Sequence, residues 1–427
     1  MAEFDGDNAY RILESIAHER LAATDGERQA AETLAGHLRG FGLEPELETF
    51  RMWTYVNDEA RLEVLKPYRK SYEAAVVGLS GETPEGGIEC GFAYVEDGSS
   101  QYLADVKGKA LLLSRGPDYD KAHELIEKGA AALITASGPH LLQKRKAWRE
   151  QMRVRVGKVP SMDITFEDAL ELVKKKASRV RLHVKQEERE GVSQNVVAEI
   201  PGTAFPDEVI ACVAHYDGVS KSVGGHDNAS GAAIIAEVAR CVAEAPLKRT
   251  VRVVLCGGEE MGLYGSRAYV AKHKDEMRNV RLCVNCDVAG AIFGMNRCYV
   301  TGPETLRWYL DAMGKEYGMG YITVSTDAYS SDNVPFSHEG VPAASIARYG
   351  GYVSEGHTSR DGYEDIDGDH LAITGRFILG FLRRAGDAVV FPFEREIADE
   401  AKKKLERYVE RMRGEHYKPL KKLKKKN

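Results

Sequence analysis

The chain has 427 residues, 43% hydrophobic and 29% charged, so it is long enough for two domains or for one large domain with an insertion. This is the composition of an ordinary globular protein, and no stretch resembles a membrane span. The net charge is −6, but it is unevenly distributed. From Glu400 onward there are 12 Lys and Arg and four Glu, so this end carries +8 and the rest of the chain −14. The strongly negative charge of the rest excludes nucleic acid as the main partner.

The N-terminal third predicts helices followed by short strands. The opening residues, MAEFDGDNAYRILESIAHER, lack the basic start and apolar stretch of a secretory signal, which predicts a cytoplasmic protein without a membrane anchor. Residues from about 6 to 40 are expected to form two helices, the second ended by Gly40 and Gly42. Between about 55 and 190, β-like runs such as GFAYV and KALLLSRG surround the predicted helix DYDKAHELIEKGAAALITASG.

From about residue 193, apolar runs alternate with helical patterns. The runs NVVAEI, EVIACVAH, TVRVVLCG, VRLCVNCD and PAASIA are short and rich in β-branched residues, as in the buried strands of a mostly parallel sheet. Between them lie patterns such as SGAAIIAEVARCVAEA and GLYGSRAYVAKHKDEM, which have helical spacing. This alternation predicts an α/β fold that binds its ligand at the carboxyl ends of the strands. Cys283 and Cys286, inside one apolar run, are predicted to be buried thiols.

Side chains that can bind a metal follow these strands or stand at the start of a helix. In chain order they are His215, Asp217, Asp227, Glu259, Glu260, Asp287 and His357. Each alone also fits a structural role, such as the N-cap of a helix for Asp227. Together, at one edge of a sheet, so many like charges would repel each other unless a cation compensated them. Two histidines and three carboxylates suit zinc, or another divalent transition metal, better than calcium.

The number of ligands also fits two metal ions that share one carboxylate and leave an open position for water. Hydrolysis then needs a further carboxylate, without a metal, that takes a proton from the water and passes it to the leaving amine. Glu259 and Glu260 suit this division, because neighbouring residues of an extended chain point in opposite directions.

The motifs HYDG, GGHDNASG, VVLCGGEEMGLYGS, VNCDVAG, SSDNVPF and GHTSRD, in this order, resemble those of the co-catalytic dizinc aminopeptidases. Relatives of that family include glutamate carboxypeptidase and the transferrin-receptor ectodomain. The stretch RLAATDGERQAAETLAGHLRGFGLE resembles its N-terminal helices, and VKGKALLLSRG with KGAAALITAS resembles the protease-associated domain often inserted there. The resemblance implies peptide substrates, two Zn²⁺ per chain and the zinc exopeptidase fold, a mostly parallel sheet flanked by helices.

The resemblance also implies a division into domains. Residues 1–55 are expected to begin the catalytic domain, and residues 56–190 to form an inserted, β-rich, protease-associated-like domain. Residues 191–395 would complete the catalytic dizinc peptidase domain. Residues 396–427 would form a C-terminal helix with a solvated basic tail. A homo-oligomer is compatible with this pattern.

Carried over residue by residue, the resemblance implies that His215, Asp227 and Glu260 bind one zinc ion. Asp287 and His357 would bind the other zinc ion, together with Asp227, which bridges the two. The implied catalytic machinery is therefore spread over the ends of several strands.

The resemblance further implies that Glu259 is the general base and that Asp217 orients His215. It also implies a cis peptide bond between Asp227 and Asn228. Both catalytic assignments concern carboxylates that do not bind a metal themselves.

Some positions depart from the pattern of the family. His226 stands where an acidic residue is common. We expect His226 to contact a metal-binding residue or to lie exposed, rather than to bind the metal itself. Asn333 stands where a histidine is common, and the neighbouring Asp332 is expected to have a structural or substrate-facing role. Tyr349 and Tyr352 are the candidates for contact with the substrate and the oxyanion, although either could serve packing.

Three alternatives remain beside the aminopeptidase. A sister family of dizinc peptidases has a large dimerisation domain between its later ligands, whereas 70 residues separate Asp287 from His357 here. A carboxypeptidase of the glutamate carboxypeptidase type needs a basic pocket, which Arg348 or Arg360 could supply. A non-catalytic, receptor-like binding module on the same scaffold should have lost metal ligands, and this chain has all of them.

Overall fold

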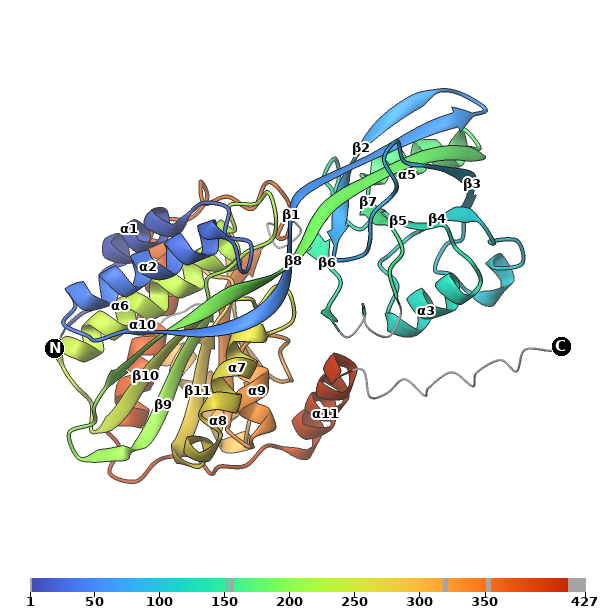
Figure 1. Cartoon of the computed structure of the whole chain (residues 1–427). Coiled ribbons are helices and arrows are strands. Elements are labelled where there is room, and N and C mark those ends of the chain that lie inside the picture. Colours follow the sequence, from blue (N-terminus) through green and yellow to red (C-terminus); the bar gives the residue numbers. More distant parts are fainter. Residues whose placement is uncertain (1, 151–152, 154–156, 318–321, 351–354, 414–427) are drawn as a thin grey trace.

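The computed structural model describes all residues except 1, 151–152, 154–156, 318–321, 351–354 and 414–427. The molecule has two parts that lie side by side (Figure 1). In the larger part, helices flank a sheet, and the smaller part is a β-rich lobe. Two long strands, β1 (Glu46–Lys66) and β8 (Arg179–Ile200), run from one part into the other. We refer to these as the helix-flanked part and the lobe.

The helix-flanked part is built from both ends of the chain. Its helices are α1 (Gly6–Ile16), α2 (Asp25–Gly40), α6 (Ser230–Glu244), α7 (Tyr264–Lys272), α8 (Glu304–Glu316), α9 (Asn333–His338) and α10 (Gly368–Gly386), with the short helical turns η2 (Gly225–Ala229) and η3 (Lys274–Asn279). Its further strands are β9 (Phe205–His215), β10 (Arg249–Cys256), β11 (Val280–Cys286), β12 (Gly294–Thr301), β13 (Ile322–Thr326) and β14 (Ala343–Gly350).

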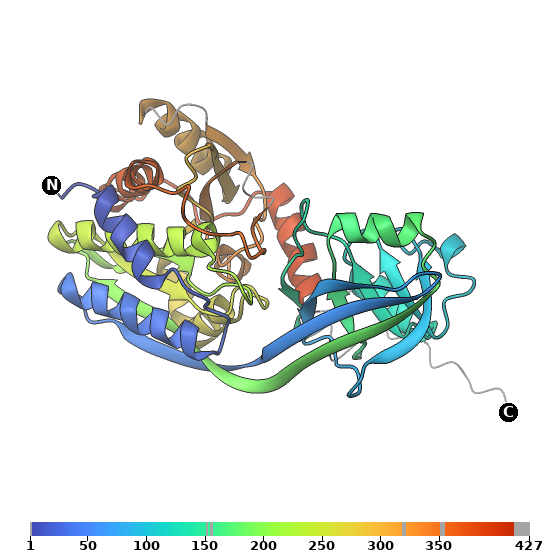
Figure 2. The same cartoon turned by 90° about the horizontal axis from the view of Figure 1, so that it is seen from above.

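The lobe contains mostly short elements. They are β2 (Lys70–Gly78), β3 (Ile88–Tyr94), η1 (Ser100–Tyr102), β4 (Lys109–Leu113), α3 (Tyr119–Glu127), β5 (Ala132–Thr135), β6 (Lys146–Ala147), β7 (Ser161–Asp163) and α5 (Phe166–Lys174). Helix α11 (Asp399–Arg413) follows the helix-flanked part in the sequence and lies between it and the lobe in both views (Figures 1 and 2).

The sheet of the helix-flanked part has the strand order β8-β10-β9-β11-β14-β12-β13. Strands β10, β9, β11 and β14 are parallel to one another, whereas β8 and β12 run antiparallel to the members of this group that they pair with. The five apolar runs that predict strands all lie in β8, β9, β10, β11 and β14. The predicted α/β fold with a mostly parallel sheet is therefore confirmed, and it places the ends of β9, β10 and β11 at one edge.

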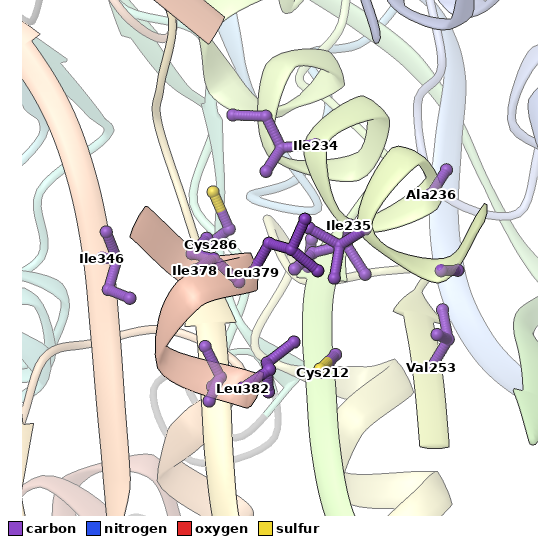
Figure 3. Packing of buried hydrophobic residues seen from close by; sticks show 14 of the residues in the cluster. Cys212, Ile234, Ile235, Ala236, Val253, Cys286, Ile346, Ile378, Leu379 and Leu382 are labelled. Carbon is purple, nitrogen blue, oxygen red and sulfur yellow. The ribbon is translucent and has the colours of Figure 1, made fainter. Parts of the chain in front are cut away.

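The core of this part lies where α6 and α10 pack on the sheet. Ile235 of α6 and the α10 residues Leu379 and Leu382 meet over the strand that carries Cys212 of β9 (Figure 3). Nearly every residue of α6 is buried, because α1 and α10 both contact it as well as the sheet. This packing gives the loop before α6 a rigid support.

The expected domain boundaries at 55/56 and 190/191 both fall inside continuous strands. β1 and β8 pair antiparallel along almost their whole length, from Glu46 opposite Val197 to Lys66 opposite Arg179. The register of this pair shifts between Val56 and Glu59, close to the expected boundary. A continuous two-stranded ribbon thus connects the lobe to the helix-flanked part, where the sequence pattern suggested a change of domain.

The seven cysteines are all free thiols and all buried, as expected for Cys283 and Cys286. Burial raises the pKa of the Cys286 thiol and of the Cys283 thiol, which keeps both protonated. Within the described residues, none of the helices combines the length and the apolar character needed to cross a membrane.

Arg20 is a buried cation that connects the N-terminal helices to the loops near the strand ends. Its side chain is 0% exposed and donates hydrogen bonds to the carbonyl oxygens of Ile16, His18, Tyr216, Val223 and Gly224. Burial lowers the pKa of Arg20 to about 10, while the carboxylate of Asp217 opposes this shift. The guanidinium therefore stays charged and offsets part of the acidic charge around it.

We expect Arg20→Met to lower the free energy of unfolding by roughly 3 kcal/mol or more, because it leaves several buried carbonyl groups without a donor. Urea unfolding followed by circular dichroism would measure this loss. Arg28→Met on the exposed face of α2 is the control and should change stability by about 0.5 kcal/mol or less. Equal stabilities of the two variants would contradict the anchoring role of Arg20.

Candidate metal centre

The metal-binding candidates meet at one edge of the sheet. His215 is the last residue of β9, Asp287 follows β11 directly, and Glu259 and Glu260 stand shortly after the end of β10. Because these strands are parallel neighbours, with Cys256 opposite His215, their ends lie together. Asp227 reaches the same edge from η2, the turn that precedes α6.

Five side chains form two groups of three that share Asp227. The first group is His215, Asp227 and Asp287, and the second is Asp227, Glu260 and His357; within each group the ligand atoms lie within 4.8 Å of one another. Nε2 of His215 lies 3.3 Å from Oδ1 of Asp227 and 3.4 Å from Oδ1 of Asp287. Nε2 of His357 lies 3.1 Å from Oδ2 of Asp227 and 3.0 Å from Oε2 of Glu260.

The expected partition of the ligands is therefore wrong in one respect. The sequence resemblance implied that Glu260 joins His215 and that Asp287 joins His357, whereas the structure exchanges these two carboxylates. Strand order leaves both carboxylates possible, since β9 lies between β10 and β11. The side chain of Asp287 lies next to His215, whereas the loop with His357 approaches Glu260. Asp227 keeps its place between the two groups.

The backbone around Asp227 is held from several sides. The peptide bond between Asp227 and Asn228 is cis, as the resemblance implied. The Asn228 side chain donates to the Cys286 carbonyl over 2.9 Å and accepts a hydrogen bond from the Val288 backbone over 3.0 Å. These contacts connect the turn that carries Asp227 to the end of β11, which carries Asp287.

The donor set fits a pair of transition-metal ions. Each group offers one imidazole nitrogen and two carboxylates, and His215 and Glu260 are almost inaccessible, with side chains 1% and 5% exposed. Buried carboxylates need a cation or hydrogen-bond donors to stay ionised. Oε1 of Glu260 is buried without a hydrogen-bond partner among the described residues, so a cation would satisfy it.

The electrostatics around the two imidazoles favour a positive charge. The pKa of His357 is raised well above its usual value, first by Glu260 and then by Asp227, although burial opposes the shift. Burial also opposes protonation of His215, but Asp217, Asp227 and Asp287 together still raise its pKa. Burial would raise the pKa of Asp227, but its two partners, His215 and His357, hold that pKa low. The negative charge of these carboxylates would also stabilise a metal cation bound here.

The same segment of the chain is matched by the family model for peptidase family M28, over residues 195–382. This segment is therefore similar to peptidase family M28. The resemblance to co-catalytic zinc exopeptidases that the motifs indicate is thereby confirmed.

Similar proteins cover almost all of the chain. Aminopeptidase YwaD of Bacillus subtilis is 27% identical over 405 residues, which are 90% of this chain and 85% of that protein. Carboxypeptidase Q of Rattus norvegicus is 27% identical over 78% of this chain and 75% of its own length. The crystal structure of BSAP, a zinc aminopeptidase from Bacillus subtilis, has a TM-score of 0.76 and 23% identity, and covers 93% of this chain and 100% of its own. At that identity the likeness establishes the fold.

Glu259 lies outside both ligand groups. Its backbone N–H donates to Oδ1 of Asp217 over 2.9 Å, while its side chain is half-buried. Burial raises the pKa of Glu259, His215 opposes this rise, and Glu260 adds to it. A carboxylate with a raised pKa that has no place among the ligands has the properties of a general base.

Asp217 connects three of the strand-end residues and is itself 0% exposed. One of its oxygens lies 3.5 Å from Nδ1 of His215, and the other accepts the backbone N–H of Glu260 over 3.3 Å. Through its hydrogen bonds to the backbone N–H groups of Glu259 and Glu260, Asp217 fixes the turn that carries both glutamates beside the imidazole of His215.

The remaining expected residues have different environments. His226 is buried, with Nε2 2.9 Å from Oδ1 of Asp365, and belongs to neither ligand group. Asp332 and Asn333 are buried at the start of α9, and burial raises the pKa of Asp332 to about 7. Tyr349 lines a cavity of about 50 Å³ together with Asp227. Tyr352, the other tyrosine candidate, lies outside the described residues.

Two further residues of this edge escaped the sequence reasoning. Asp361 accepts the His226 backbone N–H over 3.0 Å and its own carbonyl accepts that of Gly225 over 3.1 Å, which connects the loop of His357 to the turn of Asp227. Tyr329 stacks on Tyr299, with ring centroids 4.6 Å apart. Burial and the charges of Asp287 and Asp227 raise the pKa of Tyr329. Asp361 is the last residue of the motif GHTSRD, and Tyr329 directly precedes the motif SSDNVPF, but only the folded chain shows what these two residues contact.

Proposed function

We propose that this protein is a metal-dependent exopeptidase that removes residues from the N-termini of peptides. The observation that carries the proposal is the pair of ligand groups sharing Asp227, with Glu259 beside them but outside both. The match of residues 195–382 to peptidase family M28 and the likeness to Aminopeptidase YwaD support the same activity.

Two zinc ions per chain are part of the proposal. His215 and Asp287 would hold one ion and Glu260 and His357 the other, with Asp227 serving both. Zinc, when bound, acts as a Lewis acid on the peptide carbonyl and on the water that attacks it. Zinc reconstitution followed by metal analysis should give about two ions per chain. Fewer than one ion per chain would favour a receptor-like module instead.

The chain itself supplies the proton transfer. We assign to Glu259 the removal of a proton from the attacking water and its delivery to the leaving amine, for which its raised pKa is suited. Asp217 keeps the Glu259 backbone in place through the hydrogen bond to its N–H. The side chain of Glu260, the next residue, is directed at His357, so the two neighbouring glutamates serve different purposes.

Carboxypeptidase activity is the second candidate, because Carboxypeptidase Q is among the similar proteins. The two arginines that could bind a substrate carboxylate do not form a basic pocket. Arg348 is 8% exposed and donates to the Ala291 carbonyl over 2.9 Å and to the Asn296 side chain over 3.1 Å. Arg360 has a side chain 63% exposed and lies 3.8 Å from Glu355. This arrangement favours recognition of the amino end.

A pair of substrates distinguishes the two activities. We expect the zinc-loaded protein to hydrolyse leucyl-p-nitroanilide and unblocked peptides, and to cleave N-acylated dipeptides at least about 100-fold less efficiently in kcat/KM, a difference of about 2.7 kcal/mol. Chromatography of the products would identify the released residue. Cleavage of the N-acylated dipeptides alone would contradict the aminopeptidase proposal and favour the carboxypeptidase.

A further inference from the structure

The lobe contacts the loop that carries the metal-ligand candidate His357. Lys144 and Arg145, two residues of the lobe just before β6, provide both contacts. The backbone N–H of Arg145 donates to the His357 carbonyl over 2.7 Å. The Nζ of Lys144 donates to the carbonyl of Gly356, the residue before it. Two consecutive carbonyl groups of the loop are therefore held by groups that come from a distant part of the chain.

Lys144 and Arg145 are themselves fixed by a buried carboxylate of the lobe. Asp163, the last residue of β7, is 0% exposed, and its Oδ1 accepts the Lys144 backbone N–H over 2.8 Å. Its Oδ2 accepts hydrogen bonds from Thr135 and Ser137, each over 2.6 Å. A fully buried, multiply bonded carboxylate allows little movement of the segment that it holds.

His357 has a backbone conformation that requires such support. Its φ of +58° lies in the left-handed region, which is unfavourable for a residue with a Cβ and persists where neighbours hold the chain. Within its own loop, the Thr358 backbone N–H donates to the Glu355 carbonyl over 3.1 Å. The lobe provides the contacts to the carbonyl groups of Gly356 and His357.

We propose that Lys144 is a positioning residue for His357, so that the lobe and metal binding at the group of Asp227, Glu260 and His357 stabilise each other. The contacts of the lobe keep the imidazole directed at Asp227 and Glu260, and a bound zinc ion in turn keeps the loop against the lobe. Such coupling is reciprocal. This inference rests on the proposed metal centre but not on the choice between amino- and carboxypeptidase.

Hydrogen–deuterium exchange of the full, unmodified chain tests the reciprocal part directly. We expect zinc to slow exchange in peptides that cover residues 142–150, because the Arg145 amide donates to the loop that zinc would hold. Peptides from α5 (Phe166–Lys174), in the same lobe but without a hydrogen bond to that loop among the described residues, serve as the control and should exchange equally with and without zinc. Exchange in 142–150 that ignores zinc would overturn the proposal.

Variants test the positioning role of Lys144. Zinc titration against a chromogenic chelator should resolve two dissociation constants, and Lys144→Met should weaken one of them about tenfold while leaving the other nearly unchanged. Lys144→Arg, which keeps both charge and donor, should restore most of the affinity. Lys107→Met, at an exposed position of the lobe, is the matched control and should bind both ions as the wild type does.

A second variant distinguishes the effect of the hydrogen bond from Lys144 to Gly356 from the effect of the charge of Lys144. This distinction is needed because a nearby positive charge by itself lowers the affinity for zinc. In His357→Ala, one ion should remain at the group of His215, and adding Lys144→Met should leave its affinity unchanged. Equal weakening of both ions in the wild-type background would overturn the proposal. If instead zinc binds as expected but no peptide is cleaved, the proposed function fails while the role of the lobe stands.

Discussion

Glu259→Gln is expected to lower kcat about 10³-fold while both zinc ions stay bound, because general acid–base catalysis contributes roughly 10²- to 10⁴-fold. The substitution keeps the size of the side chain and removes its ability to take a proton. It also leaves the hydrogen bond from its backbone N–H to Asp217 intact, so the turn should keep its shape. Steady-state kinetics and metal analysis of the same preparation would measure both outcomes.

The neighbouring Glu260→Gln is the matched control, since the chemical change is identical and the position differs by one residue. Oε2 of Glu260 lies 3.0 Å from Nε2 of His357, so this variant should lose affinity for zinc as well as activity. Metal content thus separates the two glutamates even where both variants are slow. Near-normal kcat in Glu259→Gln, or loss of zinc from it, would contradict the assignment of the base.

The raised pKa of Glu259 also indicates how activity should depend on pH. A general base works in its ionised form, so kcat/KM should fall as the pH decreases through the pKa of Glu259. Burial and Glu260 raise that pKa, whereas His215 lowers it, and bound zinc would act in the same direction as His215. In Glu259→Gln this acidic limb of the profile should disappear.

Much of the candidate metal centre could be predicted because its residues follow a local pattern. His215, Glu260 and Asp287 each stand at or just after the end of an apolar run, and parallel strands bring such ends together whatever their exact order. The fold class could be predicted for a similar reason, since buried parallel strands are uniformly apolar and stand out between amphipathic helices. Neither prediction needed any knowledge of contacts over a long distance in the sequence.

The partition of the ligands could not be predicted, because strand order alone does not decide it. β9 lies between β10 and β11, so His215 has a carboxylate-bearing strand end on either side. Which carboxylate it faces is decided by the direction of each side chain and by the loop of His357. That loop is held in part by Lys144, about 210 residues earlier in the chain. A local sequence pattern does not predict a contact over such a distance.

The role of the connecting strands was hidden for another reason. The alternating pattern of β1 and β8 continues through both parts of the molecule, so the sequence shows a change of texture near residue 55 but no break in the strand. Arg20 was equally inconspicuous, since a single arginine between two helices is ordinarily exposed. Here its five carbonyl partners come from segments up to 204 residues away.

The second large effect is expected for Asp227→Ala, which should lose both zinc ions and at least as much activity as Glu259→Gln. Oδ1 of Asp227 lies 3.3 Å from Nε2 of His215 and Oδ2 lies 3.1 Å from Nε2 of His357, so one side chain completes both ligand groups. A ligand that binds only the folded state adds about 4 kcal/mol of stability per site at roughly 1,000 times its Kd. Zinc should therefore raise the Tm of the wild type by several degrees and leave that of Asp227→Ala unchanged.

His357→Ala provides the comparison that isolates the shared position of Asp227. It removes a ligand from one group only, so about one zinc ion per chain and part of the Tm shift should remain. Asp227→Asn separates loss of charge from loss of volume, because it keeps the shape that Asp227 fills between the two imidazoles. If Asp227→Ala retained one zinc ion as His357→Ala does, Asp227 would serve a single group, and a bridge between two metal ions would be the wrong description of this site.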